Sequence, residues 1–165
     1  MFTLSQESGA DSDEVEWLFD LAFAPGRRAL SSYKLRDGVL TVSELSLVAR
    51  DEFGALGGAI RYWPVTIGAA GTPALLLGPV AVHPTRQGEG LGALLLHETL
   101  AKARDLGWAR VVLVGDEPYY RRFGFDREAA RGLSFPPPTN PDRLLARALV
   151  DNAFDGVEGE VGRWR

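Results

Sequence analysis

The stretch that decides the fold runs from Leu75 to Gly92 and reads LLLGPVAVHPTRQGEGLG. Its first part, up to Val82, is apolar on both faces, which is typical of a strand in the middle of a sheet. Its last part is rich in glycine and leads into a segment with helical periodicity. A glycine-rich turn between a strand and a helix N-terminus can bind an anion, because unpaired backbone N–H groups and the helix dipole act at the same place. We therefore predict an anion site at Gln87 to Gly92.

A helix and a second strand are expected after this turn. The helix is predicted from Gly88 or Glu89 to Leu106, and Gly107 supplies its stop. One face of it carries Leu96, Thr99, Leu100, Ala103 and Leu106. The strand is predicted at Arg110 to Val114. Strand, turn, helix and strand form a crossover unit, so its two strands should be parallel.

Three strands are predicted before the crossover. Glu44 to Arg50 and Ala55 to Ile67 are separated by a turn at Asp51 to Gly54, which indicates a hairpin. A second turn, Gly68 to Pro73, leads into Ala74 to Val82. Sequential strands joined by short turns favour an antiparallel meander. Together with the crossover, this predicts an α/β (α+β) fold with a mixed, mostly antiparallel sheet flanked by helices.

The N-terminal part of the chain shows helical patterns. A helix capped by Ser12 is expected to carry Val15, Leu18, Phe19 and Ala22 on one face and to stop at Pro25-Gly26. Arg27 to Arg36 is a candidate for a second short helix.

The C-terminal part is less regular. Pro118 suits the first turn of a short helix that ends near Phe123. Leu133 to Pro141 is predicted to be a loop, and Asp142 to Val150 fits either a helix or a buried strand. Gly156 to Arg165 is left open between an edge strand and a tail.

Length and composition limit the class of protein. A chain of 165 residues with 45% hydrophobic and 24% charged residues suits one folded domain, 1–165. A net charge of −4 and a pI near 5.2 disfavour nucleic acid as a partner and favour a small-molecule substrate. The absence of cysteine and the presence of two histidines disfavour a metal site. No apolar run reaches the roughly 20 residues of a membrane helix, so we expect a cytoplasmic protein without a membrane partner.

Two nucleotide-binding motifs are alternatives for the glycine turn. A P-loop is excluded, because no Gly-x-x-x-x-Gly-Lys run followed by Ser or Thr occurs. A dinucleotide fingerprint fits better, since Gly88, Gly90 and Ala93 match G-x-G-x-x-A and Asp116 lies beyond the next strand. Against it, His83 to Gln87 separate the strand from the first glycine, and no further crossover unit follows.

A proline inside the predicted strand points to a third kind of ligand. Pro79 has no N–H to donate to a ladder, so Gly78-Pro79 predicts a bulge or a splayed edge. Splaying would free backbone groups of Val80 to Val82 to pair with an extended amide-containing ligand, whose pyrophosphate would lie at the helix N-terminus. A pantetheine arm joined to a pyrophosphate is coenzyme A.

Four segments resemble motifs of the GCN5-related N-acetyltransferase (GNAT) superfamily. Gln87 to Gly92 (QGEGLG) is similar to its Q/R-x-x-G-x-G/A motif, and Val80 to Pro84 (VAVHP) is similar to the V-x-V-x-P lead-in. Gly115 to Phe125 (GDEPYYRRFGF) resembles a second motif in the form found in the YhbS-like subgroup, as does Glu44 to Ala49 (ELSLVA). The resemblance implies a sheet that splays between two parallel strands, and transfer of an acetyl group from acetyl-CoA to an amine without a metal.

The resemblance also implies roles for individual residues. Coenzyme binding falls to Val80, Ala81, Val82, Gln87, Gly88, Glu89, Gly90, Leu91 and Gly92. Tyr120 matches the family's tyrosine and is the candidate general acid. A backbone N–H near Val82 would stabilise the oxyanion. Candidates for the base are His83, Glu44, Asp116 and Glu117, and the choice stays open.

Three expectations about function remain open in the sequence. The acceptor is expected to be a small-molecule amine, although no motif identifies it. Two alternatives are a non-catalytic acyl-CoA sensor and a protein or tRNA acetyltransferase of the same superfamily. The C-terminal segment would also allow a homodimer.

Overall fold

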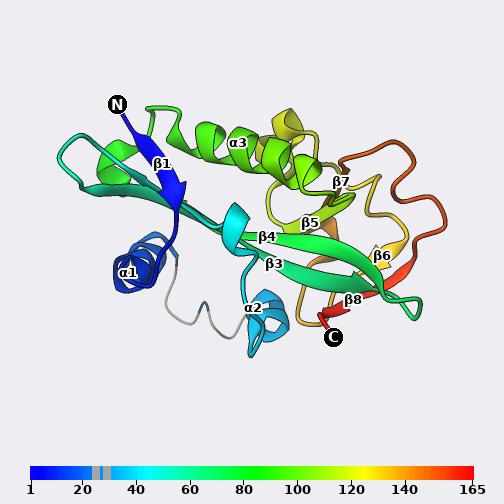
Figure 1. Cartoon of the computed structure of the whole chain (residues 1–165). Coiled ribbons are helices and arrows are strands. Elements are labelled where there is room, and N and C mark those ends of the chain that lie inside the picture. Colours follow the sequence, from blue (N-terminus) through cyan, green and yellow to red (C-terminus); the bar gives the residue numbers. More distant parts are fainter. Residues whose placement is uncertain (24–26, 28–30) are drawn as a thin grey trace.

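The computed structural model describes residues 1–23, 27 and 31–165 and is built around one mixed sheet (Figure 1). Six strands of the sheet are neighbours in the order β1 (Thr3–Gln6), β2 (Leu47–Arg50), β3 (Leu56–Ile67), β4 (Thr72–Val82), β5 (Arg110–Val114) and β7 (Leu144–Ala148). Strands β4 and β5 are parallel, and the other neighbouring pairs among these six strands are antiparallel. The predicted hairpin, meander and parallel crossover are therefore confirmed.

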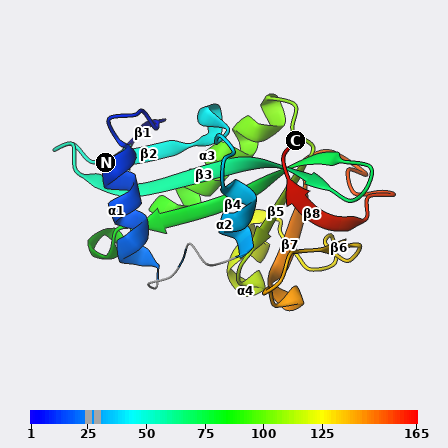
Figure 2. The same ribbon diagram turned by 90° about the horizontal axis from the view of Figure 1, so that it is seen from below.

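Helices cover both faces of the sheet. Helix α3 (Leu91–Asp105) packs on one face, and α1 (Ser12–Ala22) and α2 (Ser31–Arg36) lie on the other, as the view from below shows (Figure 2). The core under α3 includes Leu91, Leu95, Leu96, Leu100 and Ala103, all buried. Gly58 of β3 allows α3 to approach closely, because a Cβ there would lie 3.0 Å from Leu91 Cδ2. The predicted flanking of the sheet by helices is confirmed.

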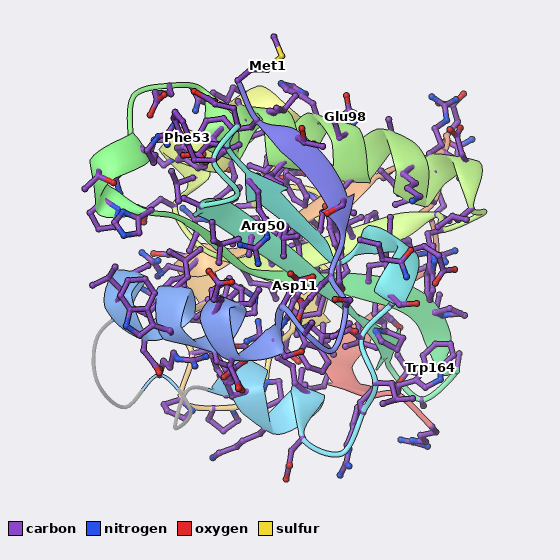
Figure 3. The ribbon with its side chains drawn as sticks, turned by 60° about the vertical axis from the view of Figure 1, so that its left-hand side comes forward. Met1, Asp11, Arg50, Phe53, Glu98 and Trp164 are labelled. Carbon is purple, nitrogen blue, oxygen red and sulfur yellow. The ribbon has the colours of Figure 1, made fainter. Side chains whose placement is uncertain are left out.

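Ion pairs join α1 to the strands beneath it. Arg50 of β2 points toward Asp11 at the start of α1, with 2.8 Å between Nη2 and Oδ1 (Figure 3). Arg61 of β3 pairs with Glu7 at 2.8 Å and also contacts Glu16 of α1. Val15, Leu18 and Phe19 provide the apolar contact with the sheet. Helix α1 is thus fixed by both burial and charge.

Strands β4 and β5 separate where the proline interrupts β4. Their parallel pairing covers Leu75 with Val111 and Leu76 with Val112, and it ends there. On the other side of β4, the register with β3 shifts between Ile60 and Tyr62. The expected bulge and splay at Gly78-Pro79 are both confirmed.

Several predicted boundaries near the site and the N-terminus were wrong. The strand predicted from Glu44 begins at Leu47, because Ser43–Leu45 form a 3₁₀ turn in which Leu45 donates its N–H to Val42. Helix α3 begins at Leu91 rather than at Gly88 or Glu89, since the glycines before it have positive φ. The cap position of α1 is Asp11, and Ser12 is its first helical residue. The stop at Pro25-Gly26 lies outside the described residues.

The structure also decides the open segments. The short helix after β5 is α4 (Glu117–Tyr120), continued by a 3₁₀ turn, Arg121–Phe123. The ambiguous Asp142 to Val150 contains strand β7. The C-terminal segment contains β8 (Gly159–Arg163), which pairs with β3 and with β6 (Leu133–Ser134) in the predicted loop. Strand β1 was not predicted.

Candidate active site

Two adjoining hollows lie where β4 and β5 separate. The first, which we call the loop groove, lies between the end of β4, the turn before α3 and the tyrosines of α4. The second, which we call the strand cavity, lies between β4 and β5 and has a volume of about 140 Å³. Val80 and Tyr120 line both hollows. A ligand in the groove could therefore meet a second ligand in the cavity beside these two residues.

The loop groove ends at the N-terminus of α3. Gly88 and Gly90 have φ of 86° and 76°, in the left-handed region that favours glycine, and Gly90 is the cap residue of the helix. The first N–H groups of α3 have no partner within the helix, and the residues at this helix end line the groove. The structure brings Gln87, Gly88, Gly90, Leu91 and Gly92 together along this groove.

Glu89 differs from its neighbours in the turn. It is absent from the groove lining, and its carboxylate accepts a hydrogen bond from Arg86 Nε at 2.8 Å. Arg86 also donates to Asp51 at 2.8 Å, which ties the turn to the loop between β2 and β3. The side chain of Glu89 therefore holds the turn in place.

The edge of β4 presents backbone groups to the gap. His83 donates its N–H to the carbonyl of Gly57 on β3 at 2.8 Å. Successive N–H groups along a strand point to opposite sides, so the N–H of Val82 points away from β3, where β5 has diverged. Val80, Ala81 and Val82 all line the loop groove. An extended ligand could pair with this edge as an added strand would.

Tyr120 stands at the junction of the two hollows. Its ring contacts Tyr119 edge to face, with ring centroids 4.9 Å apart, and lies 6.1 Å from Phe125. Burial, reinforced by the neighbouring Tyr119 and Asp116, raises the pKa of Tyr120 to about 12. The phenol is therefore protonated at neutral pH and available as a proton donor.

The four candidate bases lie outside both hollows, within the part of the chain that the structure describes. His83 interacts through Nδ1 with the hydroxyl of Thr85 at 2.8 Å. Asp116 pairs with Arg143 at 2.6 Å, and Glu117 accepts the N–H of Arg127 at 2.8 Å. Glu44 sits in the exposed 3₁₀ turn before β2. Each of them has a structural partner or an exposed position. Asp116 is next to the junction, because its backbone carbonyl accepts the N–H of Tyr120 at 3.0 Å, but its carboxylate is paired with Arg143.

Several lining residues were missed by reasoning from the sequence. Arg122 and Arg86 line the loop groove, and Arg36 and Tyr33 line the strand cavity. Arg122 could have been found, because it is the arginine of the Y-Y-x-R-F-G-F segment. No local pattern marked Arg36, which reaches the cavity from α2 on a different part of the chain.

Comparison with known proteins agrees with this geometry. The family model of the acetyltransferase (GNAT) domain matches residues 43–127, slightly more than half of the chain. The chain belongs to the GNAT family. It is accordingly an N-acetyltransferase, and the predicted superfamily and enzyme class are confirmed.

Two solved GNAT structures resemble the whole chain. The crystal structure of the N-acetyltransferase YhbS from Escherichia coli, in complex with CoA, has a TM-score of 0.84 at 30% identity and covers 98% of this chain and 89% of that one. A GNAT acetyltransferase from Brucella melitensis in complex with acetyl-CoA has a TM-score of 0.74 at 32% identity. The match covers 98% of this chain and 95% of that one. In sequence, YhbS of Escherichia coli K12 is 32% identical over 152 residues, which is 92% of this chain and 89% of YhbS.

The described residues of this GNAT protein contain neither a membrane-spanning helix nor a metal-binding cluster. No helix among them is long and apolar enough to cross a membrane. Across the same residues, no group of three or more histidine, aspartate or glutamate side chains could hold a metal ion.

Proposed function

We propose that the chain is a single-domain enzyme that transfers an acetyl group from acetyl-CoA to the primary amine of a small molecule. The observation that carries this proposal is the position of Tyr120, which lines both the loop groove and the strand cavity. The groove suits the coenzyme and the cavity suits the acceptor. The related YhbS and Brucella structures contain CoA and acetyl-CoA, which supports the same coenzyme here.

Coenzyme binding would use backbone groups for the most part. The pyrophosphate would accept hydrogen bonds from N–H groups of Gln87 to Gly92 at the positive end of α3. The pantetheine arm would pair with the exposed edge of Val80 to Val82. The guanidinium of Arg122, at the groove, would add a positive charge near the phosphates.

The reaction itself would be a direct displacement. The neutral amine attacks the thioester carbonyl, a C–N bond forms, and the C–S bond breaks. The N–H of Val82 donates to the developing oxyanion, and Tyr120 gives its proton to the departing thiolate sulfur. The proton lost by the amine passes to solvent, and solvent returns a proton to the phenolate of Tyr120. Because the pKa of Tyr120 is raised to about 12, the acid stays in its active, protonated form well above neutral pH.

The size of the strand cavity supports a small acceptor. A volume of about 140 Å³ suits a small molecule or a single side chain, and the net charge of −4 disfavours an RNA partner. These two observations favour a small-molecule enzyme over a protein or tRNA acetyltransferase.

A thiol-release assay tests the proposal. Acetyl-CoA is mixed with polyamines, amino acids, aminoglycosides or peptide N-termini, and free coenzyme A is measured, with acetyl-CoA affinity determined separately by calorimetry. We expect acetyl-CoA to bind and at least one small amine to release thiol above the rate of hydrolysis. Tight coenzyme binding without turnover of any amine would instead indicate an acyl-CoA sensor.

A further inference from the structure

Arg36 is a buried arginine at the wall of the strand cavity. Its side chain comes from the end of α2, and the residue is only 7% exposed. The guanidinium stacks on the ring of Tyr33, with Cζ 4.4 Å from the ring centroid. It also lies beside the break in β4, since a Cβ on Gly78 would be 3.3 Å from Nη2. Arg36 therefore reaches the place where the two strands separate.

Two nitrogens of this guanidinium lack the hydrogen-bond partners that buried arginines usually have. Nε and Nη1 are buried, and neither has a hydrogen-bond partner among the described residues. Buried polar groups in folded proteins are almost always hydrogen-bonded, so each exception calls for an explanation. Burial lowers the pKa of Arg36 to about 10, which leaves the group charged at neutral pH.

Two neighbouring arginines show the usual arrangement. Arg27, also at the cavity, donates to Glu16 and Asp20 at 2.9 Å each and to Tyr33 at 2.7 Å. Arg61 pairs with Glu7 and Glu16. Their positive charges are compensated inside the protein. That of Arg36 has no carboxylate partner in the described part of the chain, and Arg36 lines the strand cavity, so its charge can act on an anion bound there.

The cavity joins this free cation to the proposed reaction centre. Arg36 and Tyr120 line the same hollow. Its volume of about 140 Å³ is close to that of an engineered cavity of about 150 Å³ that binds benzene. A molecule that spans it can place only a few carbon atoms between a group at Arg36 and a group at Tyr120. A planar guanidinium fork matches a carboxylate in particular.

We propose that the acceptor is a small amino acid whose carboxylate binds Arg36 while its amine faces Tyr120. This inference rests on the proposed N-acetyltransferase function and specifies the substrate class of the same site. Neutral amines of the same size would leave the arginine unpaired, so they should be poorer acceptors. Polyamines would bring a second positive charge toward it and should be excluded.

Matched acceptors provide the test. The proteinogenic amino acids, β-alanine and γ-aminobutyrate are each compared with the corresponding carboxamide in the thiol-release assay. For the best amino acid, we expect kcat/KM to exceed that of its carboxamide by about 10- to 100-fold, the range expected for a hydrogen bond to a charged group. In Arg36→Gln, this preference should fall to near one, mainly through a higher KM.

Controls separate recognition from folding. Arg61→Gln removes a partly buried, ion-paired arginine outside the strand cavity, and it should keep the preference for the carboxylate. Arg36→Lys keeps the charge and should retain part of the preference for the carboxylate. It is the variant to use if Arg36→Gln folds poorly. Calorimetric titration of the amino acid in the presence of coenzyme A measures the same contact without turnover.

Different results refute different proposals. If carboxamides react as well as amino acids, or if Arg36→Gln keeps the wild-type preference, then the carboxylate contact is wrong while the acetyltransferase function stands. If no amine reacts and no amino acid binds, then the proposed function and the substrate class both fail.

Discussion

At the scale of single residues, the phenol of Tyr120 has the most specific proposed role. Tyr120→Phe removes one hydroxyl and leaves the ring contacts with Tyr119 and Phe125 in place. Because a general acid contributes about 10²- to 10⁴-fold, we expect kcat to fall at least about 100-fold while the Kd for acetyl-CoA stays within about twofold. Steady-state kinetics and calorimetry measure the two effects.

A second tyrosine supplies the control for this experiment. Tyr62 is buried and lines neither hollow, and its hydroxyl lies 2.7 Å from that of Thr99. Tyr62→Phe should cost about 1 kcal/mol of stability and leave kcat unchanged. If Tyr120→Phe kept full turnover, Tyr120 would have no part in proton transfer.

The pH dependence of turnover follows from the same residue. The acid form of Tyr120 is the active one, and its pKa is raised from 10.0 to about 12. We therefore expect kcat not to fall as the pH passes 10.0, where an exposed tyrosine would lose its proton. A profile of kcat against pH measures this. A fall in kcat centred at the ordinary tyrosine pKa, absent in Tyr120→Phe, would contradict the assignment.

At the scale of elements, the turn before α3 should control coenzyme affinity. Gly90 has φ of 76° and caps the helix. Gly90→Ala forces a side chain into left-handed backbone, which costs about 1–2 kcal/mol unless the turn changes shape. We expect the Kd for acetyl-CoA to rise about tenfold. Calorimetric titration measures it.

Gly54 provides a matched control in another turn. It has φ of 81° between β2 and β3, and a Cβ there would meet no atom within 4 Å, as at Gly90. Gly54→Ala should therefore destabilise the protein to a similar degree and leave the coenzyme Kd unchanged. Equal effects of both substitutions on the Kd would show that the turn before α3 has no special part in binding.

At the scale of the whole molecule, stability at high pH should reflect the buried tyrosines. Burial raises the pKa values of Tyr120 and Tyr62 above 10.0, their ordinary value in the unfolded chain. Above this pH the unfolded chain loses protons that the folded protein keeps, so the folded state becomes less favoured as the pH rises. Below pH 10.0, we expect the titration of these two tyrosines to leave the free energy of unfolding unchanged. Above pH 10.0, we expect the free energy of unfolding to fall.

Denaturant unfolding at a series of pH values measures this effect. The fall should be smaller in the double variant Tyr62→Phe, Tyr120→Phe, because neither phenylalanine titrates. An equal fall in the double variant would assign alkaline unfolding to other groups.

Local patterns in the chain were sufficient for much of the fold and for part of the site. The apolar Ala74 to Val82, the glycine turn and the periodic helix that follows predicted a parallel crossover, and Pro79 predicted the place where the strands separate. These features depend on steric and hydrogen-bonding limits of single residues. The failures lie where neighbours in space decide. Strand β1 is short and polar and exists because β2 offers an edge, and β7 is a strand because β5 lies beside it.

By itself, the sequence determined the family, the glycine turn and the tyrosine position, because each depends on residues close together in the chain. Only the tertiary structure decided that the groove and the cavity meet at Tyr120. It also brought Arg36 from α2 to the gap between β4 and β5 without a carboxylate partner among the described residues. This arrangement depends on how elements distant in the sequence pack together. A local sequence pattern therefore does not predict which buried arginine lacks a carboxylate partner.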